Sequence, residues 1–137
     1  MINPKLDGID HINIYSKART ELGRLLSNFA RTPFTGGDHE FQSVEGWWYW
    51  FKTGKQYPEL KSLSGFAAKK AGKKFKTIKR ISPTILLPVY RRKLDCNPRI
   101  ADLLNKNTLP FAHYYVFNGK VYEPVDFAWT AELWNKV

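Results

Sequence analysis

The sequence predicts an α+β fold, a single compact domain over residues 1–137 that is mostly helical with a few short strands. A length of 137 residues and a mass of 15.9 kDa suit one domain. Hydrophobic residues make up 43% of the chain and aromatic residues 15%, so a buried core is expected. Apolar residues at helical spacing alternate along the chain with short segments typical of strands.

The first third of the chain is expected to hold two short strands and one helix. The strands are predicted over 9–15 and 40–42, with turns over 16–20 and 36–38. Ser43 is a suitable N-cap for a helix from Val44 to about Thr53. Gly54 then provides a normal signal for the end of that helix.

Helices dominate the middle of the predicted fold and a hairpin dominates its end. Helical segments are expected after Pro58, over 66–70, from Ser82-Pro83 to Leu94 with a kink at Pro88, and from Asn97-Pro98 to Leu104. The segments 111–117 and 121–122 flank Asn118-Gly119, which is the strongest short hairpin signal in the chain. Asp126 is a candidate cap for a final helix through Trp134.

The charge is strongly positive, with a formal net charge of +10 and an isoelectric point near 9.8. Seven cations without an intervening acid fall in one short segment: Lys69, Lys70, Lys73, Lys74, Lys76, Lys79 and Arg80. Lysines can simply keep a surface soluble, but such clustering favours a directed patch for a polyanion such as nucleic acid. Binding to phosphates through this patch would depend on salt and carry no sequence preference.

The cellular setting follows from the cysteine count and from the start of the chain. Cys96 is the single cysteine and cannot form an internal disulfide, which fits a reducing compartment. The first residues contain no apolar run that could serve as a signal peptide, and no segment is long enough to span a bilayer. We expect a cytoplasmic protein without membrane contact, and a monomer.

Several catalytic classes are disfavoured by the spacing of their characteristic residues. His11, His39 and His113 are too scattered for a recognised zinc motif, and Cys96 has the setting of a structural thiol. No nucleophile elbow, phosphate-binding loop or dinucleotide glycine motif occurs. No metal or cofactor is expected, and carboxylate chemistry remains.

Glu45 is the best candidate for such chemistry. It follows Ser43 in the stretch Ser-Val-Glu-Gly-Trp-Trp-Tyr-Trp, which begins a helix built largely from aromatic residues. An acid in the first turn of a helix is also favoured by the helix dipole alone. Because rings at 47–50 cover every direction around the helix, at least one of them is expected to face a cleft or a partner while the others enter the core.

These residues resemble the NADAR family, also called YbiA-like. The resemblance runs in order along almost the full chain, through Ile12 to Ser16, Leu26-Ser27-Asn28-Phe29 with Pro33-Phe34, Ser43-Val44-Glu45-Gly46-Trp47-Trp48 through Lys52, Ala67 to Lys73, and the helices over 85–94 and 97–104. It implies a YbiA-like domain and N-glycosidase activity on ADP-ribosylated or related ribosyl-base substrates.

Two departures mark this chain as a divergent member of that family. The histidine that usually follows the glutamate is replaced by Gly46, so its role is either absent or supplied by His39 or His113. The family's glycine-rich motif near the C-terminus is replaced by the sequence over 114–129. Reaction type therefore carries over more securely than substrate preference.

The resemblance implies hydrolysis of a bond between a ribose anomeric carbon and a nitrogen. Glu45 would stabilise the ribosyl oxocarbenium and activate water, and Asp126 or Glu123 could supply a second carboxylate. Candidate substrate-binding residues are Ser27, Asn28, Phe29, Trp48, Lys69, Lys73, His113, Lys120 and Glu123. Among them the lysines would hold a diphosphate, and Phe29 with Trp48 would form a wall of the pocket.

Some family members remove ADP-ribose from guanine in DNA in an antitoxin-like role, and others split riboflavin-pathway ribosyl intermediates. The net charge of +10 favours ADP-ribosylated DNA as the substrate. Two alternatives stay open: an N-glycosidase of a small ribosyl-base phosphate, and a non-catalytic module that binds ADP-ribose or nucleic acid through aromatic rings and basic side chains.

Overall fold

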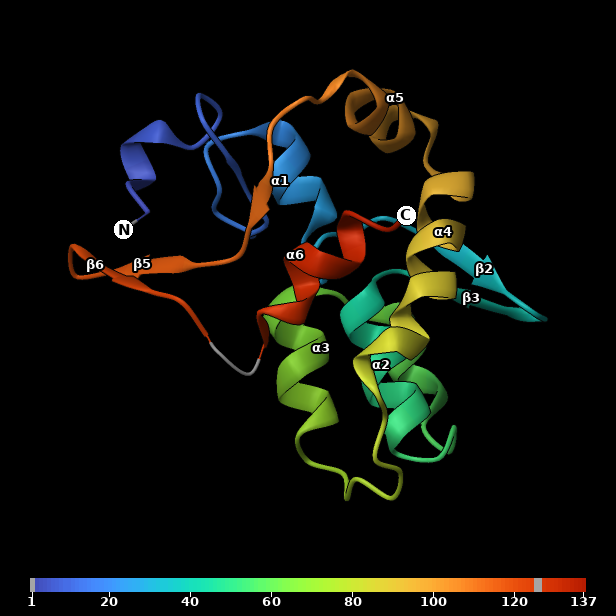
Figure 1. Ribbon diagram of the computed structural model, residues 1–137. Coiled ribbons are helices and arrows are strands. Elements are labelled where there is room, and N and C mark those ends of the chain that lie inside the picture. The colour runs from blue at the N-terminus through green and yellow to red at the C-terminus, as the bar shows by residue number, and fades with distance from the viewer. Residues whose placement is uncertain (1, 125–126) are drawn as a thin grey trace. The chain divides into compact units, whose positions relative to one another are not determined.

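The computed structural model describes residues 2–124 and 127–137 and shows an α+β fold of helices and short strands (Figure 1). The chain divides into two compact units. Unit 1 consists of Met1–Ser27 and Arg99–Val137, and unit 2 consists of Asn28–Pro98. The prediction of a single domain stays a prediction. Among the described residues, no helix has both the length and the apolar character needed to cross a membrane.

Unit 1 contains the two ends of the chain. Its elements are the 3-10 helix η1 (Pro4–Leu6), β1 (Ile12–Asn13), α1 (Glu21–Leu26), α5 (Pro98–Lys106, which begins at the boundary), β4 (Phe111–Ala112), β5 (Tyr115–Phe117), β6 (Lys120–Tyr122) and α6 (Trp129–Trp134). Unit 2 contains β2 (Phe34–Gly36), β3 (His39–Phe41), α2 (Val44–Lys52), the 3-10 helix η2 (Pro58–Ser62), α3 (Gly65–Gly72), the 3-10 helix η3 (Pro83–Ile85) and α4 (Leu86–Cys96).

A short parallel pair forms the centre of unit 1. Strand β1 pairs with β4, with Ile12 opposite Phe111, so only part of the predicted strand over 9–15 is regular. Helix α1 was not predicted from the sequence; its N-cap is Thr20, whose hydroxyl accepts a hydrogen bond from the Gly23 amide at 2.9 Å. The largest contributors to the core of this unit are Ile12, Ile14, Leu22, Leu26, Ile100, Tyr114, Leu133 and Trp134.

The predicted hairpin at Asn118-Gly119 is confirmed. Strands β5 and β6 are antiparallel and are joined by these two residues, which both have positive φ angles of 50° and 75°. Asparagine and glycine tolerate this backbone conformation, and two such residues give a turn whose twist matches that of the strands. The hairpin forms a two-stranded ribbon in unit 1 (Figure 1).

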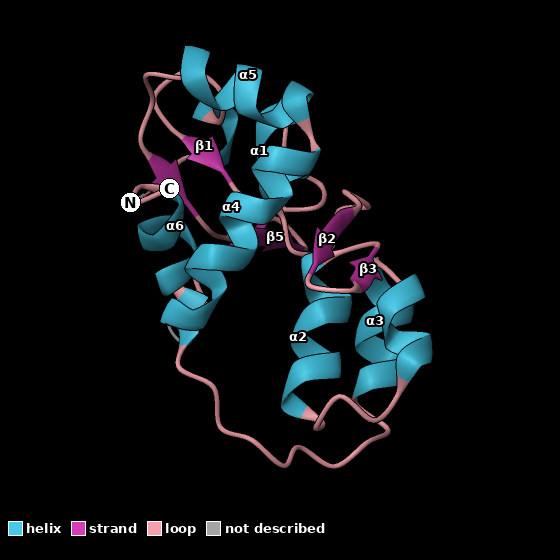
Figure 2. Ribbon diagram, turned by 90° about the vertical axis from the view of Figure 1, so that its right-hand side faces the viewer, coloured by secondary structure: helices cyan, strands magenta, loops and turns pink. Residues whose placement is uncertain are grey.

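Unit 2 combines a hairpin with packed helices (Figure 2). Strands β2 and β3 pair antiparallel around Gly37, with Phe34 opposite Phe41, which confirms the turn predicted over 36–38. Helix α4 packs against β2, and α2 packs against both α3 and η2. Its core is formed by Phe34, Phe41, Val44, Trp47, Tyr49, Trp50, Leu60, Ala68, Leu86, Val89 and Tyr90.

Helix α2 begins and ends close to the predicted residues. The Ser43 hydroxyl accepts a hydrogen bond from the Gly46 amide at 3.0 Å and donates one to the Leu63 carbonyl at 2.8 Å. The cap therefore also fixes the start of the helix on the segment that follows η2. The helix ends at Lys52, and Gly54 then takes a positive φ of 88°, as a terminating glycine does.

In helix α4 the buried face differs from the one that the spacing of apolar residues predicts. Apolar spacing in the sequence places Ile85, Leu86, Val89, Tyr90 and Leu94 on one face, but the structure buries Lys93 completely and leaves Leu94 half-buried. The stripe that faces the core is therefore Leu86, Val89, Tyr90 and Lys93, at regular helical spacing. Pro88 lies in the first turn, where the missing amide hydrogen removes no intrahelical hydrogen bond.

Candidate active site

The residues around Glu45 form the candidate active site, and all of them belong to unit 2. Glu45 lies in the first turn of α2 and is half-buried. Trp48, Tyr49 and Lys52 follow it at the third, fourth and seventh positions, so the four side chains share one face of the helix. Trp48 is half-buried whereas Trp47 and Trp50 are buried, so the Trp48 ring lies partly outside the core.

The carboxyl group of Glu45 is unusual because burial opposes its ionisation. Burial raises its pKa from an ordinary value of 4.5 to about 7, despite the opposing attraction of the ammonium groups of Lys69, Lys52 and Lys73. Near neutral pH, the protonated and ionised forms of Glu45 are therefore both populated. A carboxyl group with such a pKa can both accept and donate a proton, which general acid or base catalysis requires.

Lys52 lies against the aromatic rings of its own helix. Its ammonium nitrogen is 4.4 Å from the centroid of the Tyr49 ring and 5.6 Å from that of Trp48. These cation–π contacts hold the cation near Glu45. Burial lowers the pKa of Lys52, the Glu45 carboxylate raises it, and Lys73 lowers it, so the three groups are electrostatically coupled.

Helix α3 carries two further lysines to the same place. It packs on α2 through Ala68 and Gly72, which are both buried. A Cβ atom at Gly72 would lie 2.1 Å from the Tyr49 ring, so only glycine permits this close approach. Lys69 and Lys73 each follow one of these contact residues, and both act electrostatically on Glu45. The sequence predicted these two lysines as ligands.

Asn28 and Phe29 border the start of α2. The Glu45 amide donates a hydrogen bond to the Asn28 carbonyl at 2.9 Å, and the Gly65 amide donates one to the Phe29 carbonyl at 3.0 Å. The Tyr90 hydroxyl donates to Oδ1 of Asn28 at 2.8 Å, which fixes the amide side chain. Nδ2 is then the end of that side chain that can donate to a ligand.

Tyr90 was missed by the sequence analysis as a site residue. In the sequence it lies among apolar residues at helical spacing, and in the structure it is completely buried in α4. Its pKa is raised above the ordinary range, mainly by burial, and the Glu45 carboxylate raises it further. Tyr90 is therefore close enough to orient Asn28 and to be affected by the charge on Glu45. The only sequence signal was an aromatic residue with a hydroxyl group in an otherwise aliphatic stripe.

The other predicted residues belong to unit 1. Ser27 is the buried C-cap of α1, and Lys120 is exposed on β6. Burial lowers the pKa of His113, whose Nδ1 forms a hydrogen bond of 2.6 Å with the Ile14 carbonyl. Asp126, the proposed second carboxylate, lies outside the described residues.

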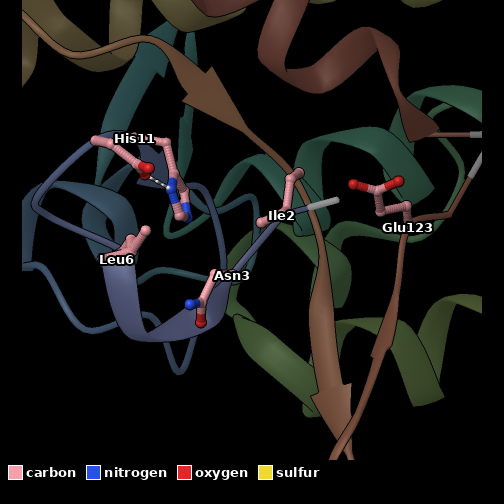
Figure 3. Close-up of a pocket in the computed structure, with 6 residues that line it drawn as sticks. Ile2, Asn3, Leu6, His11 and Glu123 are labelled. Atoms are coloured by element: carbon pink, nitrogen blue, oxygen red, sulfur yellow. Dashed lines mark hydrogen bonds and ion pairs between the residues drawn. The ribbon is translucent and has the colours of Figure 1, made fainter.

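Glu123 lines a cavity of about 530 Å³ in unit 1 (Figure 3). The view shows His11, Leu6 and Asn3 on one side and Glu123 on the other. Nδ1 of His11 lies 2.5 Å from Oδ1 of Asp10, and its Nε2 lies 2.6 Å from the Tyr114 hydroxyl. Nothing in the sequence places Tyr114 beside His11, so this hydrogen-bonded pair could not be predicted.

The structure explains why no histidine follows Glu45. Gly46 faces η2, and a Cβ atom there would lie 2.5 Å from the Leu60 carbonyl oxygen and 3.0 Å from that of Leu63. Any larger residue at 46 would require a different placement of η2. Of the two proposed substitutes, His113 lies in unit 1 and His39 lies in β3, where its Nδ1 is 3.1 Å from the Lys61 ammonium group.

Among residues 2–124 and 127–137, no group of three or more histidine, cysteine, aspartate or glutamate side chains is arranged to hold a metal ion. Comparisons with protein-family models, with curated proteins and with solved structures found no match to this chain. The resemblance to the NADAR family thus rests on the sequence motifs alone.

Proposed function

We propose that this chain is an N-glycosidase of the NADAR type that removes ADP-ribose from modified nucleic acid, with guanine in DNA as the modified base. The observation that carries the proposal is the half-buried Glu45, with a pKa of about 7, beside ammonium groups from two helices. Such an arrangement couples a proton-transfer group to cations that bind phosphate.

The reaction breaks the bond between the ribose anomeric carbon and the nitrogen of the base. The bonding electron pair leaves with that nitrogen, which takes up a proton from solvent, while positive charge develops on the ribose. Ionised Glu45 stabilises that charge and accepts a proton from the attacking water, whose oxygen bonds to the anomeric carbon. Glu45 acts as a base in this step, so turnover should increase as the pH rises through about 7.

The lysines and Asn28 supply substrate recognition in this proposal. The ammonium groups of Lys52, Lys69 and Lys73 act electrostatically on Glu45. Because that carboxyl group is only partly ionised at neutral pH, it neutralises little of their charge, and they can bind the diphosphate of ADP-ribose. Asn28 is oriented by Tyr90 and would donate to a ribose or phosphate oxygen. Trp48 and Phe29 offer aromatic surfaces for the ribose or a base.

The nucleic-acid part of the proposal rests on charge. The segment after α3 continues with Lys74, Lys76 and Lys79, which are all exposed. A small metabolite needs only the lysines near Glu45, whereas a polyanion also uses a wider patch. Replacing these three residues by glutamine should weaken turnover of modified DNA and leave hydrolysis of a small ribosyl substrate unchanged.

The central test measures release of free ADP-ribose from an oligonucleotide that is ADP-ribosylated on guanine, with a chelator present. We expect release by the wild-type protein, and loss of about a hundredfold or more in Glu45→Gln with substrate binding retained. Glu59→Gln is the matched control, since Glu59 is exposed in the first turn of η2. Equal release by Glu45→Gln and the wild-type protein would refute the role of Glu45.

A further inference from the structure

The ribbon formed by β5 and β6 presents an aromatic face. Residues directly opposite each other in an antiparallel pair lie on the same face, and Tyr115 pairs with Tyr122 while Phe117 pairs with Lys120. One face therefore carries three aromatic rings and one ammonium group. The exposed fractions are 39% for Tyr115, 62% for Phe117 and 40% for Tyr122, so much of this apolar surface faces solvent.

The aromatic surface continues beyond the ribbon to Tyr15. The rings of Tyr115 and Tyr122 are stacked, with centroids 5.3 Å apart and planes 16° apart. The Tyr15 ring lies 6.4 Å from that of Tyr115. Tyr15 and β5 also line a cavity of about 280 Å³, close to the lower end of the range for small-ligand sites. The rings of Tyr15, Tyr115 and Tyr122 thus form an aromatic platform beside this cavity, and Phe117 lies on the same face of the ribbon.

Three exposed cations flank this platform, and the carboxylate that lines the same cavity is already hydrogen bonded. Lys17 and Arg19 line the same cavity and are exposed, as is Lys120 on the ribbon. Asp7 also lines it, but it is buried, and its two oxygens accept hydrogen bonds of 2.9 Å from the amides of Asn13 and Arg19. Asp10 and Glu123 line the other cavity of unit 1.

We propose that this face of the β5–β6 ribbon binds single-stranded nucleic acid. Bases would stack on Tyr115, Phe117 and Tyr122, and phosphates would contact Lys17, Arg19 and Lys120. The combination of exposed aromatic rings with flanking cations is how proteins bind single strands without sequence preference. A duplex keeps its bases stacked internally and offers the rings no base faces, so the platform distinguishes single strands from duplexes.

The inference does not depend on the activity proposed for Glu45, because every residue that carries it lies in unit 1. It also differs from the lysine patch that follows α3, which would bind phosphates of single strands and duplexes alike. The two surfaces can be separated experimentally, since loss of an aromatic ring affects only binding through stacked bases.

The test measures binding of the full chain to a labelled oligothymidylate of about 16 nucleotides, to the matching oligouridylate and to a duplex, by fluorescence anisotropy. Phe117→Leu and Tyr122→Leu keep an apolar side chain in the ribbon but remove the aromatic ring. Phe66→Leu is the matched control, because Phe66 is an aromatic residue with an exposed fraction of 72% on α3 in unit 2.

We expect each ribbon variant to weaken single-strand binding by about tenfold, with duplex binding and the Phe66→Leu control unchanged. Log affinity falls linearly with log salt concentration, and Lys120→Gln should make this slope shallower by about 0.7. Stronger binding of the DNA or of the RNA strand would identify which polymer the ribbon prefers. Photocrosslinking of a bromouridine-containing strand should label the peptide that contains β5 and β6.

Two results would overturn the inference. The first is single-strand binding that is equal in the wild-type protein and both ribbon variants, with crosslinks confined to unit 2. The second is binding that falls equally for single strands and duplexes in the ribbon variants, since this would indicate unfolding or a purely electrostatic contact. Thermal unfolding of each variant separates these causes, and Lys120→Gln tests the surface without altering a ring.

Discussion

Replacing Glu45 by glutamine should make the protein more stable, and only at neutral and alkaline pH. The pKa of Glu45 is about 7 in the folded protein and 4.5 for an ordinary glutamate. The folded state therefore holds this proton more tightly than the unfolded state, so stability falls as the pH rises from about 4.5 to 7. The difference of 2.5 pKa units at about 1.36 kcal/mol each gives a cost of up to about 3 kcal/mol above pH 7.

Glutamine has nearly the same shape as glutamate and carries no charge at any of these pH values. The Glu45→Gln variant should therefore be more stable than the wild-type protein by up to about 3 kcal/mol at pH 8. The two proteins should have about equal stability well below pH 4.5, where Glu45 is protonated in both the folded and the unfolded state. The substitution that abolishes the proposed catalysis would thus stabilise the fold, because it removes the cost of ionising a buried carboxyl group.

Urea denaturation of both proteins between pH 4 and pH 8 would measure this difference, because groups that do not interact with Glu45 titrate alike in the two proteins. NMR titration of the Glu45 carboxyl carbon would give its pKa independently. Glu59→Gln is the control and should change stability by less than about 0.5 kcal/mol at each pH, as exposed substitutions usually do. A Glu45→Gln protein that is less stable than the wild-type protein at pH 8 would refute the reasoning.

Two further predictions concern buried positions of unit 2. Burial lowers the pKa of Lys93 from 10.5 to about 7, so stability should rise as the pH increases from 7 to 10.5. Lys93→Met should remove this pH dependence and raise stability at pH 7 by several kcal/mol. Urea denaturation of both proteins at pH 7 and pH 10 would measure the difference. Gly46→Ala should lower stability by about 1–3 kcal/mol, because the added Cβ would lie 2.5 Å from the Leu60 carbonyl oxygen. Thermal unfolding checks this, and a midpoint equal to that of the wild-type protein would contradict the packing.

Local signals explain why much of unit 2 could be predicted. Ser43 and Gly54 bound α2 through backbone requirements that depend on neighbouring residues only. The turn at Asn118-Gly119 in unit 1 is equally local, since both residues tolerate a positive φ. Glu45 could be singled out for the same reason, because its place in the first turn of α2 follows from the cap.

What the sequence could not show depends on contacts between distant segments. Lys93 interrupts an apolar stripe, and a lysine at such a position is ordinarily assigned to solvent. Asn28 and Tyr90 are 62 residues apart, and only the packing of unit 2 brings the hydroxyl to the amide. The same holds for His11 and Tyr114, which are 103 residues apart. Periodicity describes the face of one helix and contains no information about the partner of that face.

The glycines of unit 2 connect the fold to the proposed chemistry. Gly46 lets η2 approach the start of α2, and Gly72 lets α3 approach Tyr49. The contact at Gly72 brings Lys69 and Lys73 close enough to act on Glu45. The contact at Gly46 helps to bury the start of α2, which carries Glu45. Burial raises the pKa of Glu45 and the lysines lower it, so the value of about 7 reflects a balance between these two packing contacts. A substitution at Gly72 that displaced α3 would weaken the opposing attraction, and the pKa of Glu45 should then rise further above neutrality.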